Sequence, residues 1–164
     1  MKRLYLVRHA KSSWDDPDLS DIDRPLNKRG KKDAPIMGER LKNEHKAKPD
    51  LIISSPAKRA IRTARIIAKE IGYSKEKIEI KDSLYASGVT AMLNVIHYLD
   101  DSLDEVMLFG HNPDLTSLAN YLSNQQVDNI PTCGVFCVDF DVKSWQDIEK
   151  GKGIFKFFDY PKKA

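Results

Sequence analysis

Three short apolar runs, each closed by polar residues, constrain the fold of this chain more than any other feature. They occupy residues 4–7, 51–53 and 106–109. Runs this short and this uniformly apolar are typical of strands that are buried on both faces. Segments with apolar residues at helical spacing separate them. The sequence therefore predicts alternating strands and helices, a pattern typical of an α/β fold with a mostly parallel central sheet.

The helices carry recognisable start and stop signals. Pro56 is expected to open the clearest helix and Gly72 to end it. Asn27 is a favourable N-cap for an earlier helix, in which Pro35 either causes a kink or marks the first turn. Asn112 and Pro113 have the pattern of a cap followed by a proline at the first helical position. Further expected elements are a strand at residues 78–80 and two final strands at 135–142 and 154–158. Between them, Ser87 or Thr90 could cap a helix that carries Leu93, Ile96 and Leu99.

Length and composition exclude several classes of protein. The 164 residues fit one domain, taken here as residues 1–164. The net charge of +3 and a pI of about 8.7 are too modest for a nucleic-acid-binding protein. No apolar run approaches the ~20 residues of a membrane span, and the run after Lys2 and Arg3 is too short for a signal peptide. We therefore expect a cytoplasmic protein that acts without nucleic acid or membrane, with a monomer as the simplest state.

Basic residues are concentrated in segment 28–48, and Cys133 and Cys137 are the two cysteines. The cysteines are too few for a disulfide framework, and we expect buried thiols in a reducing compartment. The basic segment has two interpretations. It is either the solvated face of a helix or a rim that attracts an acidic partner or a phosphate. Its members are Lys28, Arg29, Lys31, Lys32, Arg40, Lys42, Lys46 and Lys48.

Polar side chains follow each of the three predicted buried strands. Arg8 and His9 follow the first strand, and His111 follows the third strand. Arg59 lies in the first turn of the helix that follows the second strand. Ligands of open α/β sheets bind beyond the carboxyl ends of the strands. We therefore expect these four residues, which are distant in sequence, to converge.

Two arginines and two histidines in one place suggest phosphoryl transfer. Guanidinium groups match phosphate oxygens and keep their charge. A neutral imidazole can attack phosphorus and form a covalent intermediate. A second imidazole can donate a hydrogen bond to a phosphate oxygen as charge develops there. Each residue alone is more often a surface or capping residue, and only their joint placement supports a site.

Four segments, in order along the chain, resemble the histidine phosphatase, or phosphoglycerate mutase-like, superfamily. Residues 8–15 (RHAKSSWD) resemble its RHG-x-S-x-W-N signature, and residues 25–30 (PLNKRG) resemble its P-L-T-x-x-G element. Residues 54–60 (SSPAKRA) resemble S-S-P-x-x-R-A, and residues 109–112 (FGHN) resemble the second-histidine motif. The small size is similar to that of the SixA-like branch of phosphohistidine phosphatases.

The resemblance implies a role for each matching residue. His9 would be the nucleophile, and Arg8, Arg59 and His111 would bind the phosphoryl group. The implied fold is a three-layer α/β/α sandwich, and the implied chemistry uses no metal or organic cofactor. Ala10 replaces the usual glycine of the signature, which we expect to be tolerated if the backbone there avoids φ > 0.

A second departure concerns the proton donor. Many members of the superfamily carry a glutamate in the stretch that corresponds here to residues 82–88, where the only carboxylate, Asp82, lies too early. An alcohol leaving group needs a general acid, whereas a phosphorylated imidazole can carry the required proton itself. This favours protein phosphohistidine as substrate over a phosphomonoester, and a histidine phosphotransfer domain is one protein that could carry it. Asp15 and other loop carboxylates remain alternative acids. The alternative functions are a phosphatase of small phosphate esters and a non-catalytic phosphate-sensing module.

Overall fold

A computed structural model describes residues 1–163 and contains a six-stranded sheet in the order β3-β2-β4-β1-β5-β6. The pairs among β3, β2, β4 and β1 are parallel, and β5 and β6 are antiparallel to their neighbours. The sheet is therefore mostly parallel, as predicted. The strands are β1 (Lys2–Arg8), β2 (Leu51–Ser54), β3 (Glu79–Ile80), β4 (Glu105–Gly110), β5 (Val135–Phe140) and β6 (Ile154–Asp159).

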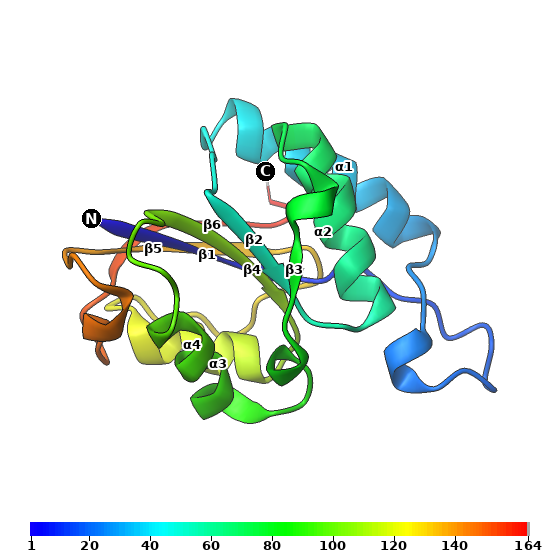
Figure 1. Ribbon diagram of the computed structural model, residues 1–164. Helices are drawn as coiled ribbons and strands as arrows, with labels where there is room; N and C mark the ends of the chain where they lie inside the picture. Colours follow the sequence, from blue (N-terminus) through cyan, green and yellow to red (C-terminus); the bar gives the residue numbers. More distant parts are fainter. Residues whose placement is uncertain (164) are drawn as a thin grey trace.

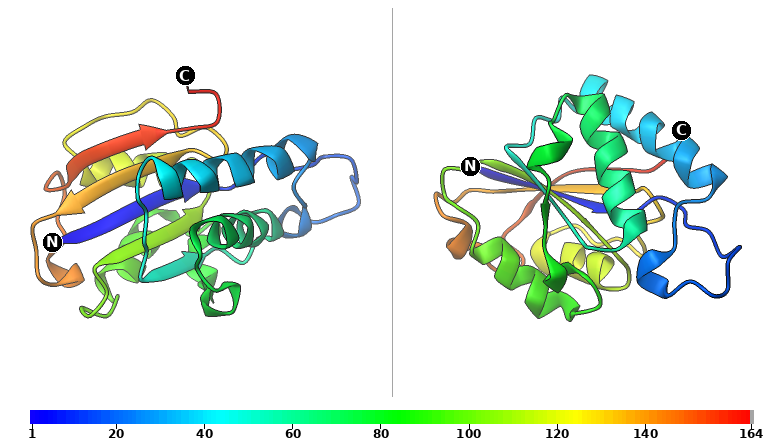
Figure 2. Two further views of the ribbon diagram at one scale, coloured as in Figure 1. Left: turned by 90° about the horizontal axis from the view of Figure 1, so that it is seen from above. Right: turned by 45° about the vertical axis from the view of Figure 1, so that its right-hand side comes forward.

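Helices cover both faces of this sheet and make the molecule three-layered. α1 (Lys28–Asn43) and α2 (Lys58–Ile71) lie on one face, and α3 (Gly88–His97) and α4 (Asp114–Leu122) lie on the other (Figure 1). The view from above shows α1 and α2 in front of the neighbouring strands (Figure 2). Short 3-10 helices are η1 (Asp21–Asp23), η2 (Lys75–Lys77), η3 (Asp82–Leu84) and η4 (Trp145–Asp147). No helix within residues 1–163 has the length and apolar character that a membrane crossing requires.

The central strand β1 explains why the buried strands read as unbroken apolar runs. Leu4 and Leu6 point into the core beneath α3 and α4, while Tyr5 and Val7 point into the core beneath α1 and α2. All four side chains are fully buried. Because successive residues of a strand face opposite sides, the middle of a strand covered on both sides carries apolar residues at successive positions.

The predicted helix signals hold with small corrections. Asn27 caps α1, its side chain accepting a hydrogen bond from the Gly30 N–H at 2.9 Å. Pro35 lies inside α1, well after its first turn, so it does not mark the start of the helix. Gly72 ends α2 with a φ of 80°, in the left-handed region that glycine favours. Pro56 precedes the α2 N-cap, Ala57, rather than lying in the helix.

The prediction for the start of α4 was wrong by one residue. Pro113 occupies the N-cap position after a cis Asn112–Pro113 peptide, and the helix begins at Asp114. The Asn112 side chain still serves the first turn, because its Oδ1 accepts hydrogen bonds from the Thr116 N–H at 3.2 Å and the Thr116 hydroxyl at 2.8 Å. A polar side chain upstream of the helix thus satisfies a free N–H group of its first turn.

Gly30 brings the start of α1 against the loop that follows β1. A Cβ atom at this position would collide with the Lys11 carbonyl oxygen, so the close approach requires glycine. The Asn27 N–H also donates to that oxygen at 3.0 Å. The PLNKRG segment therefore fixes the loop that carries the residues after His9.

Candidate active site

The four residues predicted to converge do so at the carboxyl ends of the neighbouring strands β1, β4 and β2. Arg8 ends β1, His111 follows β4, and Arg59 is the second residue of α2, which follows β2. All four line one pocket of about 540 Å³, with the loop after β1 forming much of its wall. The remaining lining residues are Lys11, Ser12, Ser13, Trp14, Asp15, Arg24, Asn27, Asn112 and Thr132.

His9 is a buried, neutral imidazole with one nitrogen held by the backbone. Its Nδ1 lies 2.7 Å from the Ala10 carbonyl oxygen, and because a carbonyl only accepts, Nδ1 carries the proton. Nε2 therefore keeps a free lone pair. Burial, together with the nearby charges of His111, Arg59 and Arg8, lowers the pKa of His9 to about 3. The ring is thus ready to act as a nucleophile at neutral pH.

His111 lies beside His9, and Ser55 orients it. The two imidazole centroids are 5.1 Å apart, and the Ser55 Oγ is 2.7 Å from His111 Nε2. The Ser55 oxygen already accepts the Ala57 N–H at 3.2 Å, so its own proton can be donated to Nε2. Burial and the charge of Arg59 lower the pKa of His111 to about 4. A neutral His111 in this arrangement carries its proton on Nδ1.

Three buried nitrogen atoms in this pocket have no hydrogen-bond partner among residues 1–163. They are Arg8 Nε, Arg59 Nε and His111 Nδ1. A buried donor left unpaired costs about 1–3 kcal/mol. A tetrahedral oxyanion offers several acceptors at once and suits two guanidinium groups and an imidazole N–H. The pocket can therefore bind a phosphate-like anion next to the free Nε2 of His9.

A carboxylate that the sequence analysis did not single out, that of Asp21, lies against Arg59. Arg59 Nη2 donates to Asp21 Oδ2 at 2.9 Å, and the Tyr85 hydroxyl donates to the same oxygen at 2.6 Å. The pKa of Asp21 lies well below its usual range, because the carboxylate accepts the hydrogen bond from Tyr85 and, as a smaller effect, pairs with the charged Arg59. Asp21 therefore stays ionised and cannot supply a proton near neutral pH.

Asp82 does not replace the missing acid. It lies exposed in η3 and is not among the residues that line the pocket. The stretch that contains it contributes Tyr85 instead, whose ring meets the edge of His111 at a centroid distance of 5.5 Å. Asp15 does line the pocket, as the sequence left open. Ala10 is buried and is not among the residues with positive φ in the described chain, so the glycine of the signature is not required there.

The groups that could hold a metal lie elsewhere. Among residues 1–163, one set, Glu44, His45 and Asp159, places its potential ligand atoms within 4.8 Å of one another. None of the three lines the pocket. Asp159 is already engaged by His45 Nε2 at 2.9 Å and by Arg40 Nη1 at 3.1 Å. These contacts explain the cluster as a structural link between α1 and the end of β6.

Comparison with known proteins places this geometry in context. Residues 4–85 match the model of the histidine phosphatase superfamily (branch 1). An uncharacterised chloroplastic protein of Arabidopsis thaliana is 32% identical over 89% of this chain and 70% of its own length. A structure from Agrobacterium tumefaciens, assigned as a phosphohistidine phosphatase SixA, is 28% identical over 98% of both chains, with a TM-score of 0.81. A protein of the same assignment from Nakamurella multipartitia is 21% identical, covers 99% of this chain and 97% of its own, and has a TM-score of 0.82.

Proposed function

This chain belongs to the histidine phosphatase superfamily, and from that premise we propose that it is a phosphatase that forms a phosphoenzyme on His9 and favours protein phosphohistidine. Residues 1–164 act as one catalytic domain. The observation that carries the proposal is the pairing of a buried neutral His9, its Nε2 free, with three unpartnered buried nitrogens of Arg8, Arg59 and His111. The likeness to a protein assigned as a phosphohistidine phosphatase SixA supports the substrate class.

The reaction has two displacements at phosphorus. In the first, Nε2 of His9 attacks the phosphorus atom and the bond to the leaving group breaks. The phosphorylated ring gains positive charge, which the Ala10 carbonyl stabilises through Nδ1–H. In the second, water attacks the same phosphorus, the bond to Nε2 breaks, and inorganic phosphate and neutral His9 are released. Arg8, Arg59 and His111 hold the phosphoryl oxygens in both steps.

The ionised state of Asp21 favours phosphohistidine over alkyl phosphates. Asp21, the carboxylate fixed against Arg59, is held ionised by Tyr85 and Arg59, so it has no proton for an alkoxide. The imidazole of a phosphohistidine can bear its own proton on the second ring nitrogen and leave neutral. The cytoplasm is the proposed compartment, and the two free, buried thiols of Cys133 and Cys137 suit its reducing conditions.

Leaving-group chemistry provides the test of substrate class. A general acid contributes about 10²–10⁴-fold, so we expect kcat/KM at pH 7 to be at least ~10²-fold higher for a phosphohistidine peptide than for glucose 6-phosphate. 4-Nitrophenyl phosphate, whose leaving group needs no proton, serves as the control and should also be hydrolysed readily. Turnover of the sugar phosphate that equals or exceeds that of the peptide would rule out the phosphohistidine preference.

Ser55 is expected to control the proton position on His111. Replacing Ser55 with alanine removes the donor to Nε2, so His111 can shift its proton away from the phosphoryl group. We expect kcat for 4-nitrophenyl phosphate to fall by roughly tenfold, within the range for weakening one fixed donor. Ser54→Ala is the matched control, because the buried Ser54 hydroxyl contacts the Ser55 carbonyl rather than a histidine. Equal kcat values for the two variants would show that Ser55 has no such role.

A further inference from the structure

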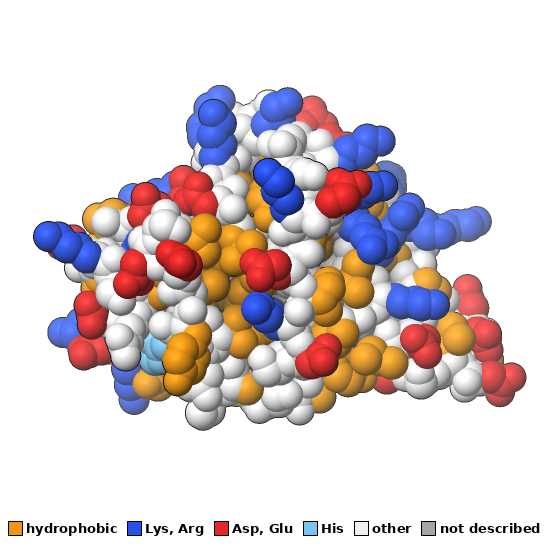
Figure 3. Space-filling model, in the orientation of Figure 1, with side chains coloured by type: hydrophobic (Ala, Val, Ile, Leu, Met, Phe, Trp, Pro, Cys, Tyr) orange, Lys and Arg blue, Asp and Glu red, His pale blue; other side chains and the backbone are white. Residues whose placement is uncertain are grey.

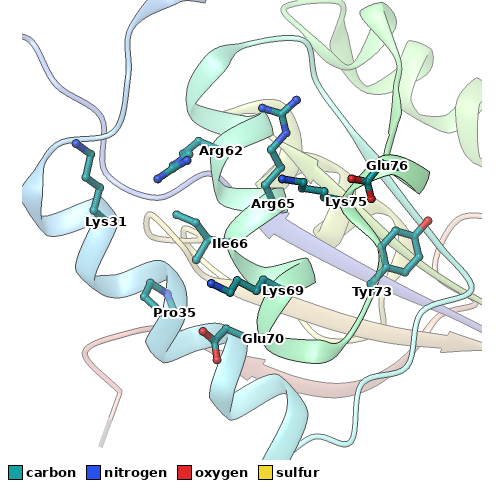
Figure 4. A pocket seen from close by; sticks show the side chains of 10 residues that line it. All are labelled: Lys31, Pro35, Arg62, Arg65, Ile66, Lys69, Glu70, Tyr73, Lys75 and Glu76. Carbon is teal, nitrogen blue, oxygen red and sulfur yellow. The ribbon is translucent and has the colours of Figure 1, made fainter.

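A wide hollow lies outside the catalytic pocket, along the surface of α1, α2 and η2. It encloses about 1000 Å³ and contains none of Arg8, His9, Arg59 or His111. We call it the α1–α2 groove. Figure 4 shows that its side chains come from α1, from successive turns of α2 and from the segment after α2. The lining residues are five cations (Lys31, Arg62, Arg65, Lys69 and Lys75), two acids (Glu70 and Glu76), and Pro35, Ile66 and Tyr73.

The five cations of the groove are exposed and belong to none of the salt bridges found within residues 1–163. Lysine and arginine side chains gather over this part of the surface (Figure 3). Clusters of one sign raise the local concentration of oppositely charged partners. The sequence grouped the basic residues of segment 28–48 by themselves. The fold instead brings Lys31 of that segment next to Arg62 and Arg65 of α2.

The groove leads towards the catalytic pocket. A second hollow of about 400 Å³ shares Lys31, Arg62 and Arg65 with it and reaches Pro25 and Leu26. The residues on either side of that pair, Arg24 and Asn27, line the catalytic pocket. The 14 residues of α2 extend for about 21 Å, with Arg59 in the first turn. A chain whose phosphorylated residue lies in the pocket can therefore continue along α2 and contact several cations of the groove.

The charges around the catalytic pocket also favour one direction of approach for an acidic substrate chain. The loop after β1 is acidic and contributes Asp15 to the lining of the catalytic pocket, whereas none of its carboxylates lines the groove. These carboxylates are Asp15, Asp16, Asp18, Asp21 and Asp23. This loop would repel an acidic chain, while the groove would attract it. The partly buried Pro35, Ile66 and Tyr73 offer apolar contact between the cations, and Glu70 and Glu76 interrupt the positive charge. Such a mixed lining fits a protein segment better than the uniform charge of a nucleic acid.

We propose that the α1–α2 groove docks an acidic segment of the phosphoprotein substrate, adjoining its phosphorylated residue. This inference rests on the proposed function and adds the chemistry of the partner. Electrostatic docking of this kind acts mainly through the rate of productive encounter, so it should appear in kcat/KM and depend on salt.

The test compares two phosphohistidine peptides that differ only in their flanking residues, five glutamates in one and five glutamines in the other. We expect Arg62→Glu, Arg65→Glu and Lys69→Glu together to lower kcat/KM for the glutamate peptide by about tenfold or more. Activity on the glutamine peptide and on 4-nitrophenyl phosphate should change less than about twofold. The matched control reverses three exposed lysines outside the groove, Lys143→Glu, Lys150→Glu and Lys152→Glu, and should leave all three activities near wild type.

A binding measurement separates failure of the docking inference from failure of the proposed function. The unphosphorylated glutamate peptide, labelled with a fluorophore, should bind wild type and the lysine control equally and the groove variant about tenfold more weakly. This readout holds even if wild type hydrolyses neither peptide, a result that would reject the proposed function alone. Equal binding to wild type and the groove variant would overturn the docking site. Tighter binding of a labelled single-stranded oligonucleotide than of the peptide would assign the groove to nucleic acid instead.

Discussion

Replacing His9 with alanine is expected to lower kcat for every phosphorylated substrate by about 10⁴-fold or more, the scale seen when an enzyme loses its nucleophile. The variant keeps the two guanidinium groups and His111 but lacks the free Nε2 of His9 that is proposed to form the covalent bond to phosphorus. Affinity for tungstate, a stable tetrahedral oxyanion, should therefore stay within about tenfold of wild type, since Arg8, Arg59 and His111 supply the main donors.

The same pair of measurements distinguishes an enzyme from a sensor. A phosphate-sensing module needs the arginines alone and would bind tungstate without turning over substrate, whether or not His9 is present. Binding by both proteins with no turnover by either would favour the sensor. The structure offers a reason to expect turnover, because the backbone hydrogen bond from Nδ1 to Ala10 and the lowered pKa both prepare Nε2 for attack.

Replacing Arg59 with alanine is expected to reduce kcat by about 10²–10³-fold, the usual cost of losing one fixed donor to a developing oxyanion. The Arg59 side chain is buried, and its Nε is one of the three unpartnered nitrogens of the pocket. The substitution also frees Asp21, which Arg59 holds through Nη2 at 2.9 Å. The measurement compares kcat for the hydrolysis of 4-nitrophenyl phosphate by wild type and by the Arg59→Ala variant.

Lys58 is the matched control for Arg59. It is the neighbouring residue of α2, carries the same charge and is exposed, and it does not line the catalytic pocket. Lys58→Ala should therefore keep kcat within about twofold of wild type, as surface substitutions usually do. Thermal unfolding of both variants checks that the buried substitution leaves the protein folded. Equal loss of activity in the two variants would contradict the site described here.

Local sequence patterns were sufficient for most of the architecture. The uninterrupted apolar residues of β1, β2 and β4 and the single stripe of α2 leave few alternatives, because each must be covered on a defined face. Predictions were weaker where the chain turns. The start of α4 was displaced by one residue at Pro113, and only the fold shows that Pro35 lies inside α1.

The candidate site was predictable in part. Arg8, His9, Arg59 and His111 could be grouped because the carboxyl ends of neighbouring parallel strands meet at one edge of the sheet. The supporting contacts could not be predicted in this way. Asp21 was one of many carboxylates in a long loop, and Ser55 was part of a quoted motif without an assigned role. Their functions emerge only from the hydrogen bonds to Arg59 and His111.

The α1–α2 groove illustrates the same limit. Arg62, Arg65 and Lys69 appear in the sequence as separate solvated charges of an amphipathic helix. Their alignment with Lys31 depends on how α1 packs beside α2. Gly38 is one determinant of that packing, because a Cβ atom there would overlap the Glu70 side chain. Long-range packing of this kind leaves no local signal in a single sequence.

Direct trapping of the phosphorylated enzyme tests the central claim, that His9 becomes covalently phosphorylated. Wild type would be mixed rapidly with ³²P-labelled phosphohistidine peptide, quenched in alkali without acid, digested and mapped. The proposed mechanism predicts an alkali-stable, acid-labile label on the peptide that contains His9, and no label in His9→Ala. Substrate turnover by wild type with the label on another residue, or with direct transfer to water and no labelled enzyme at any quench time, would contradict it.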